Sequence, residues 1–280
     1  MFYLLFDLLQ MEIIKNLLDL NKAISNHKNL GYVPTMGSLH RGHISLIKSS
    51  LKKCNKTIVS IFVNPTQFNS KKDFNKYPRN INRDLKILKK LKVDFVFIPN
   101  TKIIYNFKRS KKIKINPKYK VMCAKFRKGH FEGVLDVMDR FLRIIKAKYV
   151  FMGEKDFQQL FLIKKFIKNI HRSKIISCPI IREKNKVAMS SRNFLLNKKD
   201  INKAGIIASY LIRFKSSIKK DKKKIISLIN LKKKLEKNYK IKVEYLEFRN
   251  TFDLKKSNFK KQYKLFIAYY LRKIRLIDNF

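Results

Sequence analysis

The chain contains 280 residues, of which 45% are apolar and 12% aromatic, a composition that excludes a disordered protein and allows one large or two modest domains. Lysine and arginine give a formal net charge of +48, which raises the question of a nucleic-acid partner. Because the basic residues are spread over almost every segment, we interpret most lysines as solvated surface residues and expect no specific nucleic-acid partner.

The first ten residues are apolar, but they lack a basic leader and a small-residue cleavage site and are too short to span a bilayer. They precede Ile13 and Ile14, which can begin the first strand. The three cysteines show no spacing typical of a metal site or a disulfide. We therefore expect a cytoplasmic protein, in a reducing compartment, with no membrane partner.

Short apolar segments alternate with amphipathic ones along the first two thirds of the chain. The pattern predicts strands at residues 30–35, 57–63, 95–98, 149–152 and 175–180. It predicts helices at residues 43–51, 80–91, 134–145 and 157–169. Such alternation is typical of an α/β fold with a parallel sheet, which binds ligands at the carboxyl ends of its strands. From about residue 185 the chain is first helical and then alternates at 241–248 and 264–270, which predicts a smaller α+β domain.

The segment PTMGSLHRGH, residues 34–43, joins the first of these predicted strands to a helix through a glycine-containing turn. A helix start offers free backbone N–H groups and the positive end of the helix dipole, and both favour phosphate. His40 and His43 can donate hydrogen bonds to phosphate oxygens and stabilise charge during nucleotidyl transfer. The H-x-G-H pattern therefore predicts an ATP-using nucleotidyl-transfer site, although two polar loop histidines would show the same letters.

Polar residues follow other predicted strands. In SIFVNPTQF, residues 60–68, the strand stops at Asn-Pro and Gln67 offers an amide that both donates and accepts hydrogen bonds. In FMGEKDFQQ, residues 151–159, Lys155 near a helix start can contact phosphate, whereas Asp156 can equally be an ordinary helix cap. The segment MSSRN, residues 189–193, combines two hydroxyls with the Arg192 guanidinium, a group suited to phosphate.

In this order, the motifs resemble those of the pantoate–β-alanine ligase (pantothenate synthetase) family from about residue 11 to residue 279. The matching stretches are VPTMGSLHRGH, SIFVNPTQF, KYPR, KGHFEGV, FMGEKDFQQL, PIIRE, AMSSRN and RLIDN. The resemblance implies a Rossmann-like domain of the HxGH nucleotidyltransferase group, residues 1–184, and a C-terminal α+β lid domain, residues 185–280. Because members of the family usually start at the position of Met11, residues 1–10 are a possible extension or result from a misassigned initiation site. It also implies a homodimeric enzyme that condenses (R)-pantoate with β-alanine through a pantoyl adenylate, using ATP with Mg²⁺ and releasing AMP and diphosphate.

The resemblance assigns site residues position by position. His43 takes the catalytic, proton-donating role, Gln67 and Gln159 bind pantoate, and Gln67 also binds β-alanine. The residues expected to bind ATP are Met36, Gly37, Ser38, Leu39, His40, Arg41, Gly42, His43, Gly153, Glu154, Lys155, Asp156, Ile181, Met189, Ser190, Ser191 and Arg192. No residue is assigned to the metal.

Three positions depart from the pattern of the family. Lys128 replaces a proline before Gly129, Asp136 replaces a neutral hydroxyl residue, and Arg272-Lys273 replaces a glycine expected at a strand-to-helix turn. We expect these changes to lower stability or rate and to leave the activity in place. The alternatives are another HxGH-type nucleotidyltransferase, which would share the ATP turn alone, and a noncatalytic basic nucleic-acid-binding protein.

Overall fold

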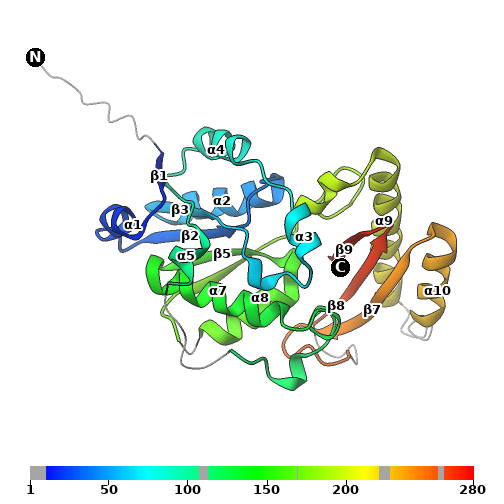
Figure 1. Cartoon of the computed structure of the whole chain (residues 1–280). Helices are drawn as coiled ribbons and strands as arrows, with labels where there is room; N and C mark the ends of the chain where they lie inside the picture. Colours follow the sequence, from blue (N-terminus) through cyan, green and yellow to red (C-terminus); the bar gives the residue numbers. More distant parts are fainter. Residues whose placement is uncertain (1–10, 107–112, 169, 221–227, 258–261) are drawn as a thin grey trace, which may run out of the picture.

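The computed structural model describes residues 11–106, 113–168, 170–220, 228–257 and 262–280. The possible extension at residues 1–10 lies outside the described residues. Figure 1 shows a parallel sheet covered by helices in one part of the molecule and a smaller sheet with two helices in the other. None of the described helices is both long and apolar enough to cross a membrane.

The larger sheet is parallel throughout, as the sequence predicts. Its strands, in spatial order, are β1 (Glu12–Ile14), β4 (Phe95–Phe97), β3 (Lys56–Ile61), β2 (Leu30–Thr35), β5 (Tyr149–Gly153) and β6 (Lys174–Cys178). The five predicted strands are confirmed within one or two residues at each end, and β1 begins near Ile13. Strand β3 stops at Ile61 because Asn64 and Pro65 start a 3₁₀ turn, η1 (Pro65–Gln67).

Helices cover both faces of this sheet. Because successive strand side chains point to opposite faces, Tyr32 packs in the core with α1, α7 and α8, while Val33 packs in the core with α2 and α4. The helices of this part are α1 (Leu17–Ile24), α2 (Arg41–Lys53), α3 (Lys71–Lys76), α4 (Ile81–Lys90), α5 (Thr101–Ile104), α6 (Cys123–Phe126), α7 (His130–Ile145) and α8 (Phe157–Ile167), with 3₁₀ turns η2 (Pro117–Tyr119) and η3 (Glu154–Asp156). All four predicted helices are present.

The C-terminal part has its own apolar core beneath a three-stranded antiparallel sheet. After the turn η4 (Ser191–Leu195), its elements are α9 (Lys198–Lys220), α10 (Leu228–Tyr239), β7 (Lys242–Asn250), β8 (Tyr263–Leu271) and β9 (Ile274–Asn279). Both stretches of alternation are confirmed as β7 and β8. The expectation of a strand-to-helix turn at Arg272 is wrong, because Arg272 and Lys273 form the tight connection between β8 and β9.

Strand β9 connects the C-terminal part to the part that contains the parallel sheet. Arg182 donates two hydrogen bonds to the Asp278 carboxylate at 2.8 and 2.9 Å. Asn279 donates through Nδ2 to the carbonyl oxygens of Glu154 and Lys155, which directly follow β5. The smaller sheet is thereby held against the carboxyl end of the parallel sheet, where a ligand site is expected.

Candidate active site

A cavity of about 300 Å³ opens where the carboxyl ends of β2, β3 and β5 meet the C-terminal sheet. It brings together most of the residues assigned from the sequence, namely Met36, His40, Gly42, His43, Gln67, Gly153, Lys155, Asp156, Gln159, Ile181, Met189, Ser190, Ser191 and Arg192. Five assigned residues are not part of the cavity wall, namely Gly37, Ser38, Leu39, Arg41 and Glu154.

The turn before α2 shows why three of these residues lie behind the wall. Gly37 and Ser38 both have left-handed backbones, with φ of 75° and 52°. The N–H groups of Ser38 and Leu39 then donate to the two carboxylate oxygens of Asp84, each at 2.7 Å. These amides stabilise the turn through α4, so they are not available to a phosphate in this structure.

His40 caps α2 with its own ring. Its Nδ1 accepts from the Gly42 N–H at 3.1 Å, and its ring stacks on His43 with centroids 4.0 Å apart. A Cβ atom at position 42 would lie 2.8 Å from Cε1 of His40, so the glycine of H-x-G-H makes room for the folded-back imidazole. Helix geometry leaves the N–H groups of Arg41 and His43 without intrahelical acceptors.

Both imidazoles are neutral at neutral pH. Burial, reinforced by His43, Lys155 and Arg83, lowers the pKa of His40 to about 2. Burial also lowers the pKa of His43 to about 4, with Asp156 opposing the shift and Lys155 adding to it. Since Nδ1 of His40 accepts a hydrogen bond, its proton resides on Nε2. In the described part of the chain, the buried Nδ1 of His43 has no hydrogen-bond partner.

The loop after β5 supplies a cation next to these histidines. Lys155 Nζ donates to Asp156 at 3.2 Å. Burial alone would raise the pKa of Asp156, but Lys155, His43 and His130 outweigh it and hold that pKa below its ordinary value. Asp156 makes no side-chain cap to α8, so the alternative of an ordinary helix cap is wrong. Glu154 instead pairs with Lys264 at 2.9 Å and ties the loop to β8.

Gln67 projects into the cavity from the turn that follows β3. Its Oε1 accepts from Asn64 Nδ2 at 3.2 Å, and its Nε2 lies 2.9 Å from the sulfur of Met36. Asn64 in turn caps η1 and donates to the carbonyl of Gly133 on α7. Asn64 therefore helps to fix the position of the Gln67 amide. Asn64 lies in the SIFVNPTQF motif, but the sequence analysis gave it no role.

Two further residues that the sequence analysis left without a role hold the backbone at Gln67. His130 Nδ1 lies 2.7 Å from the Gln67 carbonyl oxygen and Arg127 Nη2 lies 3.2 Å from it. Arg127 Nη1 is 2.8 Å from His130 Nε2, and an arginine can only donate, so the neutral His130 carries its proton on Nδ1. Burial, and then the Arg127 charge, lowers the pKa of His130 to about 3. The KGHFEGV motif, residues 128–134, was the available signal for His130, and Arg127 directly precedes it.

The two neighbouring glutamines on α8 differ in their surroundings. Gln158 is buried, and its Nε2 donates to the carbonyls of Tyr119 and Val121. Gln159 lies on the cavity wall, one turn after Asp156. Gln158 also lines the cavity, and its buried Oε1 has no hydrogen-bond partner in the described part of the chain, but its Nε2 is held by two backbone carbonyls.

The segment 188–193 closes the other side of the cavity. Ser191 Oγ donates to the Ser38 carbonyl at 3.1 Å, and Arg192 donates to Asp73 on α3 at 2.8 Å. Figure 1 shows α3 between the two parts of the molecule.

Met189 N–H donates to the Ile181 carbonyl, which fixes both residues on the wall. Arg41 points elsewhere and pairs with Glu183.

Among the described residues, no group of three or more His, Cys, Asp and Glu side chains is arranged to hold a metal ion. The nearby carboxylates already have partners, since Asp156 pairs with Lys155, Asp73 with Arg192, and Asp84 with backbone N–H groups. The donor set therefore does not form a resident metal site.

Comparison with known proteins decides the family. The sequence profile described as Pantoate-beta-alanine ligase matches residues 10–280. The chain belongs to the pantoate–β-alanine ligase family.

Individual relatives match this chain over nearly its full length. A pantothenate synthetase of Azobacteroides pseudotrichonymphae is 41% identical over 283 residues, which cover 96% of this chain and 99% of the relative. The crystal structure of pantothenate synthetase from Thermus thermophilus superposes with a TM-score of 0.89 at 26% identity, covering 96% of this chain and 99% of that one. A pantoate–β-alanine ligase from Francisella tularensis, complexed with β-γ ATP and β-alanine, gives a TM-score of 0.83 at 36% identity and covers 96% of this chain and 97% of its own.

As a member of the pantoate–β-alanine ligase family, the chain is an enzyme that joins pantoate to β-alanine. Its three departures from the family pattern lie away from the residues assigned to the substrates. Asp136 forms an ion pair with Arg140 at 2.9 Å, one helical turn along α7. The Lys128 side chain is exposed, and Arg272 has a left-handed φ of 54°, which costs a non-glycine residue about 1 kcal/mol.

Proposed function

We propose that the cavity carries out both half-reactions of the ligase, with ATP along the H-x-G-H turn, 153–156 and 189–192, and pantoate between Gln67 and Gln159. In the first half-reaction a pantoate carboxylate oxygen attacks the α-phosphorus of ATP, and the bond to diphosphate breaks. In the second, the unprotonated amine of β-alanine attacks the acyl carbon, AMP leaves, and the nitrogen loses a proton. The product is pantothenate.

The observation that carries the proposal is the environment of His43. Its buried Nδ1 has no partner in the described part of the chain, and Lys155 and the ring of His40 adjoin it. Buried polar atoms are almost always hydrogen-bonded, so this one is ready for a ligand. Because the imidazole is neutral, we assign it as an N–H donor to oxygens that gain charge during phosphate transfer.

We assign phosphate binding to Lys155 and Arg192, with Ser190 and Ser191 supplying hydroxyl groups. Arg192 then exchanges Asp73 for the triphosphate when the nucleotide binds. Mg²⁺ enters as the magnesium complex of ATP, which fits a cavity whose carboxylates already have partners. An acyl adenylate hydrolyses readily, so the C-terminal part, from about residue 185, acts as a lid that excludes water.

We also propose a homodimer in the cytoplasm, from the family resemblance. The three buried, unpaired cysteines Cys54, Cys123 and Cys178 support a reducing compartment.

His43→Ala tests the assignment of the site. Removing a transition-state donor should lower pantoate-dependent exchange between ATP and diphosphate by on the order of a hundredfold or more. The matched control is His27→Ala, because His27 lies outside the cavity wall and packs its ring against Phe95. Equal losses in both variants, with folding intact, would show that the site is misplaced.

A further inference from the structure

The cations on the cavity wall differ in whether a carboxylate neutralises them. Lys155 pairs with Asp156 and Arg192 with Asp73. Arg275 pairs with Glu244 through Nε and Nη2. Among the described residues of the wall, Arg127 is the cation that forms no ion pair.

The hydrogen-bond partners of Arg127 in the described part of the chain are neutral. Nε donates to Asn69 Oδ1 at 3.3 Å, Nη1 to His130 Nε2 at 2.8 Å, and Nη2 to the Gln67 carbonyl at 3.2 Å. A guanidinium has five N–H groups, so one on Nη1 and one on Nη2 remain for another acceptor. These three contacts fix the orientation of the guanidinium beside Gln67.

The electrostatics at Arg127 favour an anion. Burial, then the charges of Arg192 and Arg275, lowers the pKa of Arg127 to about 10. Arg127 therefore stays positive at neutral pH, but in surroundings that disfavour its charge. A bound carboxylate would relieve this repulsion and accept hydrogen bonds from the remaining N–H groups.

The substrates differ in whether they keep a carboxylate. Pantoate loses its carboxylate charge when it becomes the acyl adenylate, and that carbon must face the nucleotide. β-Alanine keeps its carboxylate through the reaction, and pantothenate retains it. Arg127 is a permanent cation next to Gln67 and is not among the residues assigned to the nucleotide. It is therefore suited to the carboxylate of β-alanine.

We propose that Arg127 binds the carboxylate of β-alanine, and later that of pantothenate, so that it selects amines that carry a carboxylate. The proposal rests on the function proposed above, because it takes Gln67 as the residue at which pantoate and β-alanine meet. Asn69 and His130 act as positioning residues, since they hold the guanidinium without being assigned to the substrate.

Measuring the two half-reactions separately distinguishes a role of Arg127 in β-alanine binding from a role in pantoate or nucleotide binding. Exchange between ATP and diphosphate with pantoate alone needs no β-alanine, whereas pantothenate formation does. We would measure both in the wild type, Arg127→Gln, Arg127→Lys and Lys128→Gln. Lys128→Gln is the matched control, because it removes a neighbouring positive charge whose side chain is exposed. Propylamine, a β-alanine analogue without the carboxylate, is the second amine.

In Arg127→Gln we expect the KM for β-alanine to rise roughly 10- to 100-fold, as for a lost charged hydrogen bond. Exchange should fall much less than ligation, because His130 still contacts the Gln67 carbonyl. The preference for β-alanine over propylamine should fall by a similar factor. Arg127→Lys should recover part of the loss, and Lys128→Gln should match the wild type.

An unchanged KM for β-alanine in Arg127→Gln would overturn the proposal. So would exchange that falls as far as ligation, because Arg127 would then serve pantoate or the nucleotide. If wild-type exchange does not respond to pantoate at all, the proposed function itself fails, which is a separate result.

Discussion

At the scale of single residues, the cavity owes its chemistry to histidines that are buried without a carboxylate partner. The pKa values of His40, His43 and His130 fall to about 2, 4 and 3, from an ordinary value of 6.5. Three neutral imidazoles next to Lys155 and Arg127 can each donate one N–H without adding positive charge. The sequence predicted the contact of two of them with phosphate, but it did not predict that they are neutral.

These pKa values predict how stability depends on pH. In the unfolded chain a histidine takes up its proton near pH 6.5, while the folded protein does not, so the unfolded state binds more protons below that pH. The stabilisation is complete above pH 6.5 and is lost as the pH falls from there to the folded pKa of each histidine, about 4 for His43 and about 3 for His130. The free energy of unfolding should decrease by roughly 1.4 kcal/mol per pH unit for each such histidine.

Denaturant unfolding of the wild type and His130→Asn between pH 7.5 and pH 4.5, at constant ionic strength, measures this effect. The variant should show a shallower slope by about one proton, whatever its stability at pH 7.5. Equal slopes would mean that His130 is protonated in the folded protein.

Among the residues assigned from contiguous motifs, most lie on the cavity wall, whereas the residues that support them had no role assigned from the sequence. Lys155, Gln159 and Arg192 lie on the cavity wall, as assigned. Asp84 lies more than forty positions from the turn whose N–H groups it binds, and no local pattern connects them. Arg127 directly precedes the KGHFEGV motif, but its lack of an ion pair is a property of the folded chain.

At the scale of elements, α7 supports the substrate side of the cavity. A Cβ atom at Gly133 would lie 2.5 Å from the Thr66 carbonyl oxygen, so glycine allows the helix to touch η1. Periodicity predicted the helix from residue 134, whereas it begins at His130, after Gly129 with its φ of 80°. Apolar periodicity shows the buried middle of a helix, but the first turn here is set by the turn geometry and by His130.

Elements with a strong pattern were predictable, and short connecting elements were not. The strands of the parallel sheet are continuous apolar runs because both faces are buried, and they stand out from a lysine-rich background. Helices α3 and α6 are six and four residues long, and tertiary contacts such as Arg192–Asp73 hold α3 against the C-terminal part. The β8–β9 hairpin was missed because Arg272 occupies a position typical of glycine.

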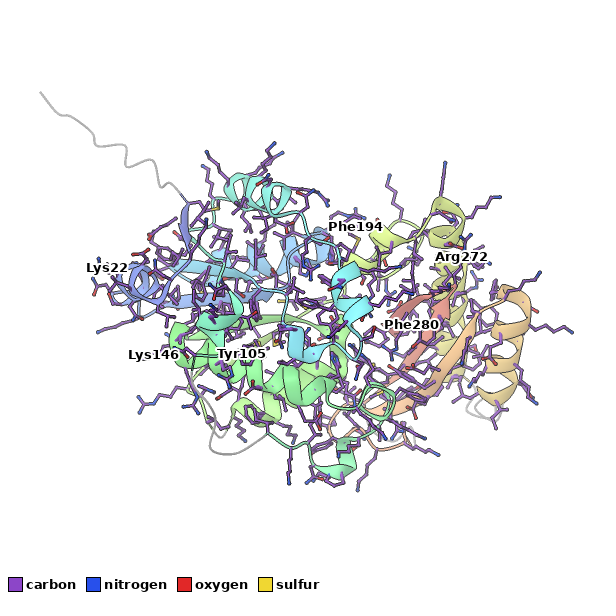
Figure 2. All side chains as sticks on the ribbon, viewed as in Figure 1. Lys22, Tyr105, Lys146, Phe194, Arg272 and Phe280 are labelled. Atoms are coloured by element: carbon purple, nitrogen blue, oxygen red, sulfur yellow. The ribbon has the colours of Figure 1, made fainter. Side chains whose placement is uncertain are left out.

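At the scale of the whole molecule, basic side chains of the described residues extend from both parts. Figure 2 shows basic side chains extending outward from the parallel-sheet part, where Lys22 and Lys146 are labelled, and from the C-terminal part at Arg272. Dispersed lysines attract polyanions without reading their sequence.

We therefore expect binding to RNA and DNA to be nonspecific and to fall steeply as salt rises, because each lysine–phosphate contact releases counterions. Titration of several duplexes and single strands across a salt series measures this dependence. One preferred ligand held tightly at physiological salt would show instead that the charge forms a specific binding surface.

The most direct test of the account is AMP release by the purified protein, with ATP, pantoate and β-alanine each omitted in turn. One cavity that activates pantoate and then transfers it predicts AMP release only when all three are present. It also predicts that pantoate alone supports exchange between ATP and diphosphate. Exchange driven by an amino acid or a nucleoside monophosphate, and not by pantoate, would contradict the account.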